Sequence, residues 1–151
     1  MKKILLGLVC LMVLAAADPV AAQDDISPKG IVIIPAIGMI QVVYEAPIVN
    51  RAHDVFWAGD SVYHLEDTAW LEDERGIALA GHNPGVFGRL GELRKGDVVV
   101  VLDTQRIEVY RITGAYLVPV SGVGWIYSSS EIVTLITCDG EERLVVQAFR
   151  E

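Results

Sequence analysis

Eight short runs rich in β-branched and aliphatic residues follow one another along most of this chain, separated by turn-forming residues such as Pro35 and Gly38. The runs are Gly30–Ile34, Ile40–Tyr44, Gly76–Ala80, Val98–Leu102, Ile107–Ile112, Ala115–Val120, Ile132–Thr137 and Leu144–Phe149. Such segments are typical of β-strands. Because eight strands in one domain leave exposed edges unless the sheet closes, the pattern favours an all-β fold, a closed antiparallel eight-stranded barrel.

The predicted connections between the runs are short. Asp103–Arg106 predicts a hairpin turn, and Asp139–Glu142 is short enough to predict antiparallel pairing of the last two strands. Ser61–Leu71 is compatible with a helical turn or two, and the apolar spacing of Phe87–Leu93 predicts a short helix or 3₁₀ turn. We therefore expect one or two short helices beside the barrel.

The N-terminus differs in composition from the rest of the chain. Lys2 and Lys3 precede an apolar run, Ile4–Ala17, and the small-residue stretch Val20–Ala22 follows it. This order is typical of a secretory signal, and a run of about 14 residues is short of the roughly 20 that span a bilayer. We expect residues 1–22 to be a signal peptide cleaved after Ala22, with an uncleaved membrane anchor as the alternative. Residues 23–29 would then be a polar lead-in and 30–151 one catalytic domain, exported to the cell surface or beyond.

Charge and cysteine content narrow the function further. The net charge of −8 at pH 7 argues against nucleic acid or an anionic membrane as the main partner. Cys10 lies within the apolar N-terminal run, so cleavage would leave Cys138 as the only cysteine. A lone cysteine in an exported protein is a reactive thiol, an intermolecular link or an inert buried residue.

Three side chains combine into a candidate catalytic set. Cys138 ends the run Thr134–Thr137, where a thiol at the rim of a barrel would be half exposed and reachable. His82 follows another apolar run and precedes a turn at Asn83–Gly85 that would hold it at a strand end. Arg143 returns near the cysteine after the turn, where it would favour a thiolate or an oxyanion, or would instead pair with a neighbouring glutamate. A nucleophile, a proton shuttle and a fixed cation suit acyl transfer.

The other two histidines fit this chemistry less well. His53 lies in a polar loop and is expected to face solvent, whereas His64, between Tyr63 and Leu65, is expected to be packed as a structural residue. The separations between the histidines and Cys138 do not match zinc-ligand spacing, so we expect no metal or cofactor.

The motifs together resemble those of the sortases. They are Ala80-Gly81-His82-Asn83, Phe87-x-x-Leu90-x-x-Leu93-x-x-Gly96-Asp97, Thr134-Leu135-Ile136-Thr137-Cys138 and Arg143-Leu144-Val145-Val146. The order of the three catalytic types separates the chain from papain-like hydrolases, in which cysteine precedes histidine, and Thr137 stands where L,D-transpeptidases carry glycine. Two departures concern subclass and anchoring: the turn from Cys138 to Arg143 is short, and the N-terminus looks cleavable.

The resemblance implies a sortase barrel that cleaves an LPXTG-like sorting signal between Thr and Gly through a thioacyl enzyme. Cys138 would be the nucleophile, His82 the acid and base, and Arg143 the group that holds substrate and oxyanion. Substrate contacts would come from the expected groove residues Ala80, Thr137, Val120, Trp125 and Tyr127, the last three in or beside a specificity loop within Val118–Ser130.

The partners that the resemblance implies are secreted proteins with a C-terminal sorting signal and an amine acceptor, a cell-wall peptide or a pilin lysine. No nucleic acid is expected, and membrane association is expected only through the N-terminus. Two alternatives stay open: a thiol endopeptidase with water as acceptor, and a non-catalytic peptide-binding barrel.

Overall fold

The computed structural model describes residues 27–46, 48–49, 52–53 and 60–151. The expected signal peptide therefore lies outside the described residues. In the described part of the chain, no helix has the length and apolar character needed to cross a membrane.

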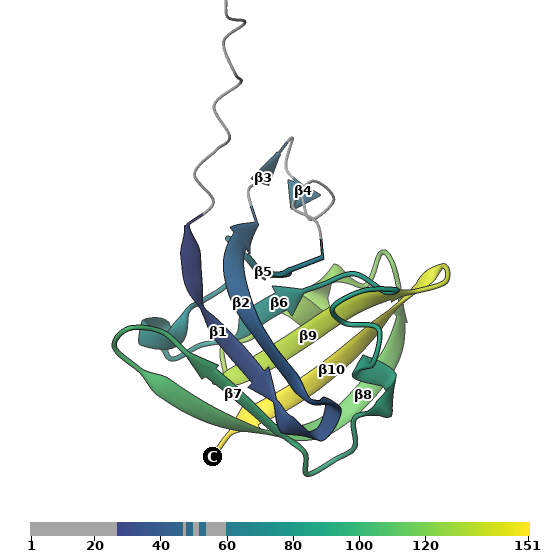
Figure 1. Cartoon of the computed structure of the whole chain (residues 1–151). Coiled ribbons are helices and arrows are strands. Elements are labelled where there is room, and N and C mark those ends of the chain that lie inside the picture. The colour runs from purple at the N-terminus through teal and green to yellow at the C-terminus, as the bar shows by residue number, and fades with distance from the viewer. Residues whose placement is uncertain (1–26, 47, 50–51, 54–59) are drawn as a thin grey trace, which may run out of the picture.

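A closed barrel of eight strands forms the body of the molecule (Figure 1). Around the barrel the order is β1, β2, β5, β6, β9, β10, β8 and β7, after which β7 pairs with β1. The strands are β1 (Pro28–Ile34), β2 (Met39–Ala46), β5 (Val62–Leu65), β6 (Ile77–Ala80), β7 (Val98–Leu102), β8 (Ile107–Pro119), β9 (Ile132–Asp139) and β10 (Glu142–Arg150). The closed eight-stranded barrel predicted from the sequence is confirmed.

Two of the neighbouring pairs, β2 with β5 and β6 with β9, are parallel, whereas the sequence predicted an antiparallel barrel throughout. The other six pairs are antiparallel, including the predicted pair of β9 and β10. Parallel neighbours need a long crossover connection, and the chain between β6 and β9 supplies one by building η3, β7, β8 and η4 on the way. This crossover brings the ends of β6 and β9 to the same rim.

Alternation along each strand separates the inside of the barrel from its outside. The interior is one aliphatic and aromatic cluster to which most strands contribute, for example Val32, Val99, Tyr110, Leu135 and Val146. A second, smaller apolar cluster lies outside, over β5, β6 and β9. The barrel thus carries a filled core and a separate apolar surface on one wall.

The helical segments are short 3₁₀ turns: η1 (Pro35–Ile37), η2 (Leu71–Asp73), η3 (Leu90–Glu92) and η4 (Val123–Ile126). The turn expected within Phe87–Leu93 is confirmed as η3. The helical turn expected within Ser61–Leu71 is wrong for Val62–Leu65, which is strand β5 with all four residues buried. There, burial between β2 and β6 overrides the local preference.

Three other boundaries differ from the sequence-based ones. Ile107–Ile112 and Ala115–Val120 are not separate strands but parts of β8, which passes through an irregularity opposite Gln147 and Ala148. β1 begins at Pro28, inside the expected lead-in. β3 (Ile48–Val49) and β4 (Ala52–His53) form a small hairpin that no run predicted.

Candidate active site

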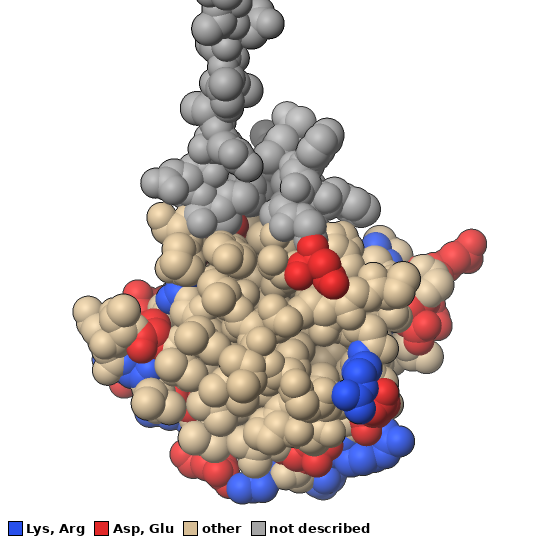
Figure 2. All heavy atoms as spheres, viewed as in Figure 1, with Lys and Arg blue, Asp and Glu red and all other residues tan. Residues whose placement is uncertain are grey.

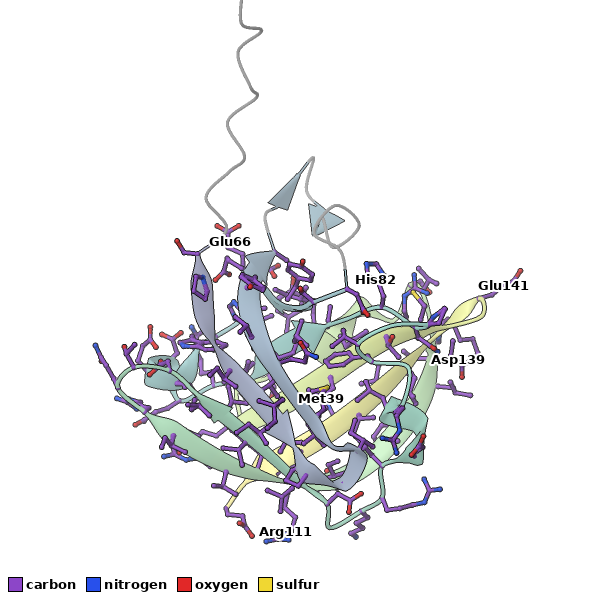
Figure 3. The ribbon with its side chains drawn as sticks, in the orientation of Figure 1. Met39, Glu66, His82, Arg111, Asp139 and Glu141 are labelled. Carbon is purple, nitrogen blue, oxygen red and sulfur yellow. The ribbon has the colours of Figure 1, made fainter. Side chains whose placement is uncertain are left out.

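The parallel pairing of β6 and β9 brings His82 to Cys138. Ala80 pairs with Ile136, so two further residues along each chain place the histidine beside the cysteine. Strand alternation puts Cys138 on the same outward face as Ile136, because their neighbour Leu135 lies in the interior. Figure 3 shows His82 and Asp139, the residue after the cysteine, at the same end of the barrel. Cys138 is half-buried, with a free thiol.

Arg143 lies directly across the hairpin from Cys138. The two residues are register partners between β9 and β10, and directly opposed residues of an antiparallel pair share one face of the sheet. The guanidinium donates from one nitrogen to the carbonyl oxygen of Glu142 at 3.0 Å, and the residue is half-buried. Among the described residues, no salt bridge joins Arg143 to Glu141 or Glu142. The structure therefore brings the three predicted catalytic residues to one rim.

Three hydrogen bonds connect the chain after β6 to the end of β9. The amide of Gly81 donates to the carbonyl oxygen of Ile136 at 3.2 Å, and the hydroxyl of Thr137 donates to the carbonyl oxygen of Gly81 at 2.7 Å. The side-chain amide of Asn83 donates to the carbonyl oxygen of Cys138 at 2.9 Å. These bonds leave little freedom for His82 to move relative to Cys138.

Thr137 differs from its expected place in the groove. Its side chain is only 3% exposed and points to the opposite side of β9 from Cys138, because adjacent residues of a strand alternate. Its hydroxyl contacts the backbone beside His82 instead. Thr137 therefore positions the histidine segment in this structure.

On the outer face of the barrel, β5, β6 and β9 carry an apolar floor. Ala80 and Ile136 pack against the outer cluster, which contains Ala78, Tyr63 and Ile126.

 Ile126 comes from η4, so the segment after β8 folds back onto the floor built by β5, β6 and β9.

The expected specificity-loop residues lie before, within and after η4. Val120 follows β8 and is 52% exposed, and Tyr127 follows η4 and is 53% exposed. The backbone of Trp125 belongs to η4, whereas its side chain lies outside the described part. These positions are compatible with substrate contact, which stays a prediction for each of them.

Tyr127 connects the loop to the opposite side of the floor. Its hydroxyl donates to a carboxylate oxygen of Asp67, and this hydrogen bond raises the pKa of the phenol above its ordinary value. The amide of Gly76 donates to the carbonyl oxygen of Ser128 at 3.1 Å, so the loop is also attached to the start of β6. Two hollows of about 300 and 410 Å³ border Tyr127 and Ser128. Both lie at the far end of the floor from Cys138.

The remaining histidines are not part of this set. His64 is 1% exposed, with Nε2 bonded to the carbonyl oxygen of Ala69 at 2.8 Å and Nδ1 to a carboxylate oxygen of Glu45 at 2.8 Å. It is packed as the sequence predicted. The side chain of His53 lies outside the described part. Among the described residues, no group of three or more His, Cys, Asp or Glu side chains is arranged to hold a metal ion.

Sequence reasoning missed the role of Asn83. The residue was recognised only as part of a turn and a motif, whereas its amide bridges to Cys138, 55 positions along the chain. The available signal was a hydrogen-bond donor, Asn83, directly after the candidate base His82. Its partner, Cys138, could not be found from the sequence, because their proximity depends on the parallel register of β6 and β9.

A thiol, an imidazole and a guanidinium at one rim of a β-barrel define a cysteine acyl-transfer site. The model of the sortase domain matches residues 32–151, and the chain belongs to the sortase family, whose general activity is cysteine transpeptidation. No curated protein matches the chain by sequence.

Solved structures of several sortases share the fold. Sortase E from Streptomyces avermitilis is 26% identical over 83% of this chain and 88% of its own, with a TM-score of 0.70. Sortase C-3 from Streptococcus pneumoniae is 25% identical over 86% of this chain and 65% of its own, with a TM-score of 0.73. The Clostridium perfringens sortase D5 transpeptidase is 21% identical over 83% of this chain and 79% of its own, with a TM-score of 0.72. Because sortases of classes C, D and E match with similar TM-scores, the comparison does not assign this chain to a subclass.

Proposed function

We propose that this protein cleaves an LPXTG-like sorting signal between Thr and Gly and transfers the threonyl group to an amine. The observation that carries the proposal is the register of β6, β9 and β10, which gathers His82, Cys138 and Arg143 at one end of an apolar floor. Strand β9 runs from Ile132 through the floor residue Ile136 to Cys138, so the floor can support a short extended peptide that ends at Cys138.

The first half of the reaction forms the thioacyl enzyme. The Cys138 thiolate attacks the threonine carbonyl carbon, and the new carbon–sulfur bond places negative charge on the carbonyl oxygen. Arg143, on the same face as the thiol, is placed to stabilise that charge. As the carbon–nitrogen bond breaks, the His82 imidazolium donates its proton to the departing glycine amine.

The second half regenerates the enzyme. An incoming amine attacks the thioester while neutral His82 accepts a proton from it, and the carbon–sulfur bond breaks to release the Cys138 thiolate. We propose a cell-wall peptide or a pilin lysine as the amine. When water replaces the amine, the same steps give a free threonine acid, which is the endopeptidase alternative.

We propose export as well, supported by the signal-like order of Lys2, Lys3, Ile4–Ala17 and Val20–Ala22. Substrates would then be secreted proteins with a C-terminal sorting signal. Mass spectrometry of the protein recovered from its host should give a chain that starts at Gln23. An intact N-terminus would instead support the membrane anchor.

Mass spectrometry of the enzyme with a sorting-signal peptide library tests the chemistry. We expect a thioester on Cys138, ligated product when a glycine oligomer is added, and neither with Cys138→Ala. Full turnover by a correctly folded Cys138→Ala protein would refute the mechanism. Free threonine acid as the only product, even at high amine concentration, would select the endopeptidase.

A further inference from the structure

The chain after His82 folds into a tight turn that closes back on the histidine, and we call residues 82–88 the histidine turn. The amide of Phe87 donates to the carbonyl oxygen of His82 at 3.0 Å. The side chains of Val86 and Phe87 pack over Gly81, since a Cβ added there would lie 2.7 and 2.9 Å from them. A displacement of the histidine turn would therefore move the backbone that carries the imidazole.

One side chain from outside the histidine turn is bonded to it. A carboxylate oxygen of Asp60 accepts a hydrogen bond from the amide of Val86. The same oxygen lies against the point that a Cβ of Gly85 would occupy, and the Cβ of His82 is 3.2 Å from that point. Because Gly85 has no Cβ, the carboxylate approaches both the turn and the base of the histidine side chain.

Asp60 holds the histidine turn from the side of β6 that faces β5. In the barrel, β6 lies between β5 and β9. Tyr63 pairs with Ala80 in antiparallel register, so the residues before β5 run beside those after β6. On the other side, the side-chain amide of Asn83 attaches the same segment to Cys138 at the end of β9. The histidine turn is thus bonded to the chain on both sides of β6.

The surroundings of Asp60 indicate that the hydrogen bond matters more than the charge. Asp60 is exposed, and Figure 2 shows acidic side chains at the surface of the end of the barrel where Figure 3 labels His82. Water and salt screen a charge in such a position. A hydrogen bond, in contrast, fixes the distance and direction between the carboxylate and the amide of Val86.

We propose that Asp60 is a positioning residue for His82. The proposal rests on the proposed function, in which His82 gives a proton to the departing amine and accepts one from the incoming amine. Such a transfer needs heavy atoms about 2.6–3.2 Å apart. Without the Asp60 carboxylate the histidine turn loses its attachment on the β5 side, so the imidazole reaches the reacting nitrogen less often. The apolar floor stays unchanged, so binding of the peptide is preserved.

Steady-state kinetics of Asp60→Ala and Asp60→Asn with a sorting-signal peptide tests this role. We expect Asp60→Ala to lower kcat about 10- to 100-fold with little change in KM, since a misplacement of about 1 Å can cost about 10²-fold. An asparagine keeps a side-chain oxygen that accepts from the amide of Val86. Asp60→Asn should therefore restore kcat to within a few-fold of the parent.

Asp97→Ala is the matched control, because Asp97 also caps a backbone turn. Its carboxylate accepts the amide of Arg94 at 2.7 Å. The neighbouring Gly96 accepts a hydrogen bond from Arg111 at 2.9 Å, and Figure 3 labels Arg111 at the other end of the barrel from His82. Removing this carboxylate should leave kcat unchanged.

NMR of the enzyme without peptide tests the placement of His82 separately from the reaction. The Cε1–H resonance of the His82 ring can be assigned from its loss in His82→Gln. We expect this resonance to shift in Asp60→Ala and to stay close to its parent position in Asp60→Asn and Asp97→Ala. The expected shift in an enzyme that cleaves no sorting-signal peptide would refute the proposed function but support the placement of His82 by Asp60.

Three results would overturn the proposal. The first is an Asp60→Ala protein with the kcat of the parent and an unshifted His82 resonance. The second is a kcat in Asp60→Asn as low as in Asp60→Ala, which would assign the effect to the charge. The third is an equal loss in Asp97→Ala, which would show a general effect of removing a turn cap. Near-UV circular dichroism of each variant checks that the fold is intact.

Discussion

At the scale of single residues, Cys138 and Arg143 depend on the register of one hairpin. A slip of one residue between β9 and β10 would turn one of the two side chains to the other side of the sheet. The short turn at Gly140, which has a positive φ of 60°, fixes this register. The placement of Arg143 relative to Cys138 is therefore set by the β9–β10 hairpin.

Replacing Arg143 should damage the reaction more than its change in charge suggests. We expect Arg143→Ala to lower kcat about 10²- to 10³-fold, as for loss of an oxyanion donor, and Arg143→Lys to restore only part of it. Steady-state kinetics with a sorting-signal peptide measures both. Arg111→Ala, at the other end of the barrel from His82 in Figure 3, should leave kcat unchanged; equal losses in the two alanine variants would show a general effect on the fold.

Asn83 should act through the position of Cys138. Asn83→Ala removes a hydrogen bond worth about 0.5–1.5 kcal/mol, so we expect kcat to fall several-fold with little change in KM. Asn83→Asp should be worse, since it keeps the shape but turns an acceptor toward the carbonyl oxygen of Cys138. Single-turnover acylation rates separate this effect from product release, and identical rates in all three proteins would contradict it.

At the scale of elements, the sequence predicted the strands better than their neighbours. Runs such as Val98–Leu102 were recognisable because alternating burial requires apolar residues locally. β5 was missed because Val62–Leu65 is short and becomes a strand only through pairing with β2 and β6. His82 and Cys138 were found because each follows a strand, but their meeting depends on a parallel pair that links distant segments.

The pairing of β1 with β7 requires a glycine. A Cβ at Gly30 would lie against the carbonyl oxygen of Leu102 and 2.8 Å from Cζ2 of Trp70. We expect Gly30→Ala to destabilise the fold by about 1–3 kcal/mol and to lower the Tm by several degrees in differential scanning calorimetry. Gly124→Ala, where the added Cβ meets nothing within 4 Å, is the control. A Gly30→Ala protein as stable as the control would mean that β1 and β7 separate without cost.

At the scale of the whole molecule, stability rests on the filled interior. Tyr110 is 3% exposed on β8, and burial, with a smaller contribution from Glu108, raises its pKa to about 12. In the unfolded chain a tyrosine titrates near pH 10. The raised pKa means that its contribution to stability is constant below about pH 10 and is lost as the pH rises toward 12.

This dependence gives an alkaline test of the barrel. Urea unfolding of the parent and of Tyr110→Phe can be measured from below pH 10 to about pH 12. We expect the parent to lose stability relative to the variant above about pH 10, because phenylalanine cannot ionise. Groups common to both proteins cancel in the difference. Parallel stability profiles for the two proteins would place the Tyr110 hydroxyl in contact with water.

Closure of the whole barrel could be predicted from the sequence, but the positions of apolar side chains on its outer surface could not. The number of strands and their exposed edges require closure whatever the order. In contrast, Val42, Ile31, Leu102 and Ile107 form one outward-facing row only because β2, β1, β7 and β8 are neighbours. In the sequence these residues look like ordinary strand positions.

The crossover between β6 and β9 has a consequence for how this protein could diversify. The proposed acid–base residue His82 and the proposed nucleophile Cys138 follow its two ends, which are held together by backbone pairing that does not involve the intervening chain. Insertions within this crossover, most readily after β8, could therefore change peptide preference while His82 and Cys138 keep their spacing. Grafting that one segment from a distant relative would be an economical way to redirect the enzyme to a new signal.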